Sequence, residues 1–106
     1  MNKVLLLGTV ENEPEIRYVD KGVCVAQLTL RTTDRMLIKN EGGENQEVIE
    51  FHRVVLWREL GELVEKYVHA NDVINVEGKL HYRSYSDHSG LTHHLVEVWA
   101  SSFEKI

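Results

Sequence analysis

Residues 50–57, EFHRVVLW, followed at once by residues 58–68, RELGELVEKYV, decide the fold of this chain. In the first stretch, Val54 and Leu56 alternate with Arg53 and Trp57, which is the two-residue period of a strand. In the second stretch, apolar residues recur at helical spacing, with glutamates on the other side. They are Leu60, Leu63, Val64, Tyr67 and Val68. The sequence therefore predicts a strand that runs into an amphipathic helix, the one convincing helix in the chain.

Upstream of this junction the sequence predicts two more strands. The first covers residues 3–10, with a continuation through residues 15–18, and the second covers residues 23–32. The turn sequence Asp20-Lys21-Gly22 separates them. In the second strand one face is apolar, with Cys24, Ala26, Leu28 and Leu30 at period two. We expect a long polar loop over residues 34–47, and loops of that length usually bind something or move.

Downstream of the helix, a turn at Asn71-Asp72 leads into a strand over residues 73–85. A second turn over residues 86–90 precedes a last strand over residues 91–100. The order is three strands, one helix and two strands. This order is typical of the five-stranded OB barrel, an all-β fold whose second and third strands and flanking loops bind oligonucleotides. With 106 residues we expect one such domain over residues 1–106.

Composition limits the class of protein. Hydrophobic residues make up 42% and charged residues 27% of the chain, as in soluble globular domains, and no apolar run is long enough for a membrane span. The single cysteine, Cys24, lies among apolar neighbours, so we expect a reducing cytoplasm. The net charge of −5 argues against nucleic-acid binding when it is taken alone. Phosphates respond to the local field of a groove, however, so the placement of the basic residues decides.

One face of each of two strands alternates cations with rings. The first strand places Phe51, Arg53, Val55 and Trp57 on this face, and the second places Lys79, His81, Arg83 and Tyr85. Each nucleotide of a single strand has one phosphate and one flat base. The cations of such a face can neutralise the phosphates, and its rings can stack on the bases. A single exposed ring is more often a core or dimer contact. Matching faces on two strands raise a single-strand binding site to equal standing with core or dimer contacts, and both interpretations stay open at this point.

Other aromatic and basic residues have weaker assignments. Arg31, Arg35 and Lys39 lead into the long loop and could guide the nucleic acid, although solvated loop charges are the alternative. We assign Tyr67 and Trp99 to packing, and Trp99 also to a possible subunit contact.

Several segments resemble the bacterial single-stranded DNA-binding protein (SSB) family, in the family's order and over essentially the whole chain. They are residues 2–8, 13–18, 26–30, 50–57, 76–80 and 85–90. The resemblance implies an OB barrel, assembled as a homotetramer that binds single-stranded DNA without sequence preference in replication, recombination and repair. It implies neither catalysis nor a cofactor.

The resemblance also implies roles for particular residues. The stacking aromatics of the family match Phe51, Trp57 and Tyr85. The family commonly has a further tryptophan in the long loop, where Met36 is the nearest residue here, and a methionine cannot stack like an indole. His81 and Ser84 stand where the family is often basic. We therefore expect weaker phosphate attraction, or a stronger pH dependence through His81.

For assembly, the family's residue equivalent to His52 lies near subunit contacts, and we assign Val4 and Leu6 to the same oligomer interface. Lys3, beside them, is assigned to the DNA. The family usually continues into a flexible tail with an acidic tip that recruits replication and repair proteins. This chain stops at Ile106 without such a tail, and the sequence leaves open whether it is a truncated or a naturally short relative.

Catalytic and metal-binding interpretations find little support. His88, His93 and His94 suggest zinc, but the adjacent pair would point to opposite faces of a strand and no cysteine lies nearby. We predict no metal, no cofactor and no catalytic residue. Two alternatives stay open. One is a dimeric accessory resembling primosomal replication protein N, which acts mainly through protein contacts, and the other is an OB-fold nuclease, which needs a carboxylate cluster.

Overall fold

The computed structural model describes residues 1–37 and 45–106, and these residues form a barrel of strands with one helix. The elements are β1 (Val4–Val10), β2 (Glu15–Val19), β3 (Val23–Leu37), β4 (Asn45–Trp57), α1 (Glu59–Tyr67), β5 (Val73–Ser86) and β6 (Thr92–Lys105). β1 and β2 together correspond to the first predicted strand, so the helix follows the third barrel strand. The predicted OB architecture, with its helix between the third and fourth barrel strands, is confirmed.

Strand pairing closes the sheet on itself. The strand order is β1-β5-β6-β4-β3-β2, and an additional pairing of β1 with β3 places Val10 opposite Leu30. One junction is parallel and short, since β4 meets β6 only at Val54 with Val98 and at Val55 with Trp99. This junction brings the outer surfaces of β4 and β6 side by side.

The barrel interior holds the core that the alternation predicts. Its buried members are Val10, Ala26, Leu28, Leu30, Val54, Leu56, Val64, Val68, Ile74, Val76 and Val98. α1 contributes Val64, and it packs closely at Gly61, where an added Cβ would lie 2.9 Å from the Leu56 carbonyl oxygen. α1 has nine residues, and in the part of the chain described here no helix is long and apolar enough to cross a membrane.

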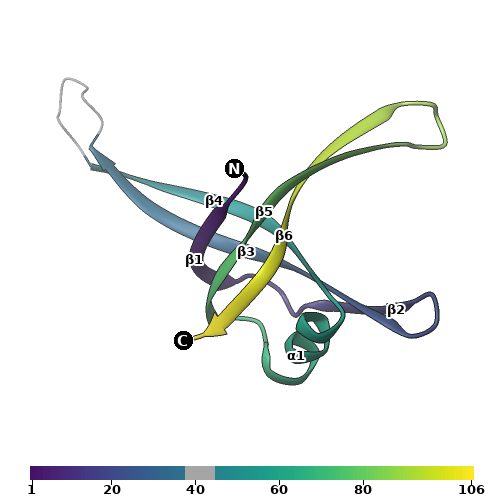
Figure 1. Ribbon diagram of the computed structural model, residues 1–106. Helices are drawn as coiled ribbons and strands as arrows, with labels where there is room; N and C mark the ends of the chain where they lie inside the picture. The colour runs from purple at the N-terminus through teal and green to yellow at the C-terminus, as the bar shows by residue number, and fades with distance from the viewer. Residues whose placement is uncertain (38–44) are drawn as a thin grey trace.

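Two antiparallel arms leave the barrel, as Figure 1 shows for β3–β4 and β5–β6. The β3–β4 pairing continues until Leu37 lies opposite Asn45, and the β5–β6 pairing until Ser86 lies opposite Thr92. The predicted loop over residues 34–47 is therefore wrong at both of its ends, and its centre lies outside the described residues. A hairpin arm satisfies its backbone hydrogen bonds without a buried face, so polar side chains did not reveal it.

β6 contains a β-bulge that the sequence did not reveal. Gly78 lies opposite Ala100 and Glu77 opposite Ser102, so Ser101 has no partner on β5. The extra residue resets the alternation. Ala100 and Phe103, three positions apart, both pack against the core as a result. The predicted strand end at Ala100 is wrong, because the two-residue period stops at the bulge while the strand continues to Lys105.

Candidate nucleic-acid interface

The outer face of β4 carries exposed rings on both sides of an arginine. Phe51 and Trp57 are 60% and 40% exposed, whereas Val54 and Leu56, on the opposite face, are buried. Arg53 lies between the two rings and is partly exposed. Since directly opposed residues of an antiparallel pair share a face, Arg31 of β3 lies beside Phe51. The side chains on this face can therefore meet bases and phosphates from solvent.

The outer face of β5 continues the pattern on the second arm. His81, Arg83 and Tyr85 alternate along it, and the Tyr85 side chain is 47% exposed. The Tyr85 ring stacks on the His93 ring of β6, with centroids 5.0 Å apart and planes 19° apart. His93 Nε2 in turn lies 2.7 Å from Asp87 Oδ2. The Tyr85 ring is thus packed against His93 on one side, and the rest of it is open to solvent.

A buried carboxylate joins the two outer faces. Glu97 of β6 accepts from Arg53 Nε at 2.9 Å and from Arg83 Nε at 3.0 Å. These contacts require the outer faces of β4, β5 and β6 to form one continuous surface. We call this surface the binding face; its members are Phe51, Arg53, Trp57, His81, Arg83, Tyr85, Glu97 and Trp99.

Trp99 lies on the binding face rather than in the barrel core, and it packs there against rings from β4 and β5. Its ring meets Trp57 edge to face, and the His81 ring stacks on it with centroids 3.7 Å apart and planes 28° apart. Sequence reasoning missed it because the parallel junction of β4 with β6 leaves no local signal. Val98 points into the barrel, so alternation along β6 turns the next residue, Trp99, outward. This alternation could have indicated the direction of Trp99.

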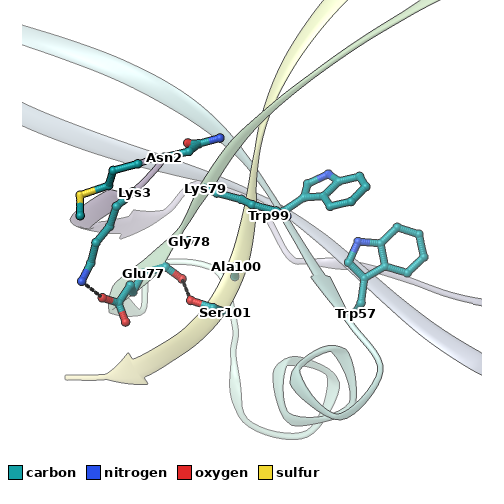
Figure 2. Close-up of a pocket in the computed structure, with 10 residues that line it drawn as sticks. Asn2, Lys3, Trp57, Glu77, Gly78, Lys79, Trp99, Ala100 and Ser101 are labelled. Atoms are coloured by element: carbon teal, nitrogen blue, oxygen red, sulfur yellow. Dashed lines mark hydrogen bonds and ion pairs between the residues drawn. The ribbon is translucent and has the colours of Figure 1, made fainter.

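A groove of about 540 Å³ borders the binding face and is lined in part by Met1, Asn2 and Lys3. Figure 2 shows residues that line it. Trp57 and Trp99 line one part of it, and Lys3 and Glu77 line another. Lys3 Nζ lies 2.7 Å from Glu77 Oε1, and its hydrogen bond and charge lower the pKa of that carboxyl. Lys79 also lines the groove. The two predicted lysines therefore lie at the edge of the face, with one of them already paired.

The cations predicted near the long loop have different positions. Arg31 Nη1 lies 3.0 Å from Glu11 Oε2, so this guanidinium already has a carboxylate partner. Arg35 lies exposed on the β3–β4 arm. The backbone of Met36 belongs to β3, but its side chain and the whole of Lys39 lie outside the described residues.

The residues assigned to an oligomer interface do not share one environment. His52 Nε2 lies 2.8 Å from Thr32 Oγ1. Val4 and Leu6 pack against the core, so alternation along β1 turns Leu5 and Leu7 outward instead, and both are more than half exposed. The outward apolar surface of β1 consists of those two leucines.

The histidines do not gather into a metal site. Within residues 1–37 and 45–106, no three His, Cys, Asp or Glu side chains lie close enough together to hold a metal ion. His93 is paired with Asp87, and His81 stacks on an indole.

A closed OB barrel whose outer wall alternates exposed rings with arginines defines a nucleic-acid-binding module. The model of the Single-strand binding protein family matches residues 1–106, and the chain belongs to this family. The family is named for binding, which agrees with the expectation of a non-catalytic protein.

Individual relatives agree with this membership. The chain is 40% identical over 106 residues to a single-stranded DNA-binding protein of Bacteroides thetaiotaomicron, of which it covers 66%. It is 32% identical to one from Xanthomonas axonopodis pv. citri, of which it covers 58%. The chain thus spans roughly three fifths to two thirds of the length of these curated relatives.

Solved structures show the same barrel. An SSB of Plasmodium falciparum in complex with ssDNA matches the whole chain and 95% of its own length, with a TM-score of 0.94 and 25% identity. A deletion mutant of the single-stranded DNA binding protein from Thermus aquaticus matches the whole chain and 50% of its own length, with a TM-score of 0.87 and 29% identity.

Proposed function

We propose that this protein binds single-stranded DNA without sequence preference and protects it during replication, recombination and repair. One observation carries the proposal. Phe51, Trp57 and Tyr85 are all exposed on one continuous face, where Arg53 and Arg83 lie between them. Stacking on such rings contributes about 1–3 kcal/mol per base and tolerates every base, because each base has a π-face.

The local charge of the face supports phosphate contact in spite of the acidic total. Arg53, Arg83 and Lys79 supply cations on or beside the rings, whereas most of the carboxylates lie on α1, the turns and the outer strand ends. Phosphate neutralisation releases counterions, so it adds a term that falls as salt rises. A small number of such contacts suffices when stacking supplies the rest.

The assembly we propose is a homotetramer, with a dimer as the less favoured state. Exposed Leu5 and Leu7 on β1, and His52 on β4, supply surface for contacts between copies. We place the protein in the cytoplasm, beside the DNA it binds, with replication and repair proteins as partners. The dimeric accessory with mainly protein contacts is not favoured, since family and relatives are named for single-stranded DNA binding.

Titration with oligo(dT) at two salt concentrations, followed by tryptophan fluorescence, tests the proposal. We expect quenching that saturates, because Trp57 and Trp99 both lie on the binding face, and an affinity that falls as salt rises. Absence of binding at low salt would refute the proposed function. The native mass of the free protein, measured in parallel, tests the tetramer, and a dimeric mass would overturn that part.

A further inference from the structure

Glu97 is the charged residue that the barrel buries, and it lies on the binding face. Its side chain is 3% exposed, and no other charged or polar side chain among the described residues is classed as buried. A buried carboxylate is costly unless hydrogen bonds and opposite charges compensate it. A surface that attracts phosphate gains nothing from a carboxylate of its own, so this residue needs an explanation.

The donors around Glu97 come from three strands, β4, β5 and β6. Arg53 Nε donates to Oε2 at 2.9 Å, while Arg83 donates from Nε to Oε1 at 3.0 Å and from Nη2 to Oε2 at 3.3 Å. Trp99 Nε1 adds a longer contact to Oε1 at 3.4 Å. Arg53 Nη2 also donates to Gln27 Oε1 at 2.8 Å. Each guanidinium therefore uses its Nε and one Nη nitrogen inside the protein.

The carboxylate is ionised at neutral pH. Burial raises the pKa of Glu97, but hydrogen bonds from Arg83 and Arg53 outweigh it, and the pKa lies below its ordinary value. Two guanidinium charges and one carboxylate charge then leave the triad of Arg53, Arg83 and Glu97 with one net positive charge. At the distance of a bound phosphate, the triad therefore acts as one arginine would, although it contains two.

We propose that Glu97 limits the affinity of the binding face for single-stranded DNA. It holds the inner donors of Arg53 and Arg83 and cancels one of their charges, so the two arginines together neutralise about one phosphate. The inference rests on the proposed function and deepens it. Glu97 is a positioning and charge-setting residue, and it also keeps both guanidinium groups in place beside the rings.

The variant Glu97→Gln tests the charge while keeping the shape of the side chain. We expect it to bind oligo(dT) about three- to tenfold more tightly at low salt, because a negative charge near the phosphate is gone. The slope of log affinity against log salt should steepen by about 0.7, the value for one more phosphate on a single strand. Glu104→Gln is the matched control. It removes the same formal charge from the exposed end of β6 and should change neither quantity appreciably.

A double variant keeps the inference testable if Glu97→Gln folds poorly. Arg83→Gln alone leaves the triad without net charge, so its salt slope should become shallower by about 0.7. Arg83→Gln combined with Glu97→Gln restores one net positive charge and buries no unpaired ion. We expect the double variant to recover the wild-type salt slope although one arginine is missing. Thermal melts identify the folded variants.

Two results would overturn the inference. One is a salt slope for Glu97→Gln equal to that of Glu104→Gln, and the other is equal slopes for Arg83→Gln and the double variant. Either would mean that Glu97 serves only to hold β4 and β5 together. These results differ from failure of the proposed function, in which the wild-type protein itself does not bind oligo(dT).

Discussion

The indole rings of Trp57 and Trp99 meet edge to face, with centroids 5.9 Å apart and planes inclined by 65°. The pair joins β4 to β6 above their short parallel junction, where Val55 lies beside Trp99. Edge-to-face contact favours one orientation of both rings. Trp57 still exposes 40% of its surface, so it offers a base a platform that is already ordered before the DNA arrives.

Replacing Trp57 should weaken DNA binding without unfolding the barrel. We expect Trp57→Ala to cost about 1–3 kcal/mol of oligo(dT) binding free energy, because one stacked base loses its platform. Trp57→Phe, the matched control, should retain most of the affinity. Anisotropy of a labelled oligonucleotide measures both. Wild-type affinity for Trp57→Ala at the same salt would show that the DNA follows another surface.

Arg58 should be a source of backbone strain at the start of α1. It has φ 57° and ψ −124°, a region that residues with a Cβ rarely adopt. We expect Arg58→Gly to raise the free energy of unfolding by about 1 kcal/mol, as the relieved strain exceeds the added freedom of the unfolded chain. Urea unfolding measures the change.

Asn71 provides the comparison for that variant. Its φ is 74°, and asparagine tolerates positive φ better than arginine does. Asn71→Gly should therefore leave the free energy of unfolding nearly unchanged. An equal gain at both positions would argue against a particular strain at Arg58.

Asp87 should hold the tip of the β5–β6 arm until strongly acid pH. Hydrogen bonds from Ser89 and His93 lower the pKa of Asp87 from 3.8 to about 2. A carboxyl with a depressed pKa contributes its full stabilisation above the unfolded value and loses it as pH falls through the folded value. The acid transition of the amide signals of Ser89 and Leu91 should thus have its midpoint near 2 and not near 3.8.

Two observations decide that experiment. Asp87→Asn should abolish the acid transition at Ser89 and Leu91, while amides of the barrel core report any global unfolding. A midpoint near 4 in the wild-type protein would show that the hydrogen bonds of the tip do not stabilise the charged form.

Much of the fold followed from local periodicity. Val54 and Leu56 follow the two-residue period of a strand, and Val64 lies at helical spacing from Leu60. Val54, Leu56 and Val64 all belong to the core, and Leu60 packs against it. The polar ends of β3 and β4 have no buried face. Their pairing depends on backbone hydrogen bonds that continue from the barrel, and side-chain patterns carry no record of them.

The binding face was predictable along each strand but not across strands. Phe51, Trp57 and Tyr85 were recognised because each shares one face of its strand with an arginine, Arg53 or Arg83, at the two-residue period. Glu97 and Trp99 were not, because their roles depend on the junction of β4 with β6. That junction is formed by residues more than forty positions apart, and only the closed barrel brings them together.

The bulge at Ser101 has a consequence for how the length of this chain can vary. Removing one residue there would reverse the direction of the side chains on one side of the bulge. Either Phe103 would then point into solvent, or Trp99 would point towards the core. Insertions and deletions should consequently be tolerated at the tips of the two arms, because the side chains there do not have to alternate between a core and solvent. Related proteins should differ in arm length while the count between Trp99 and Phe103 stays constant.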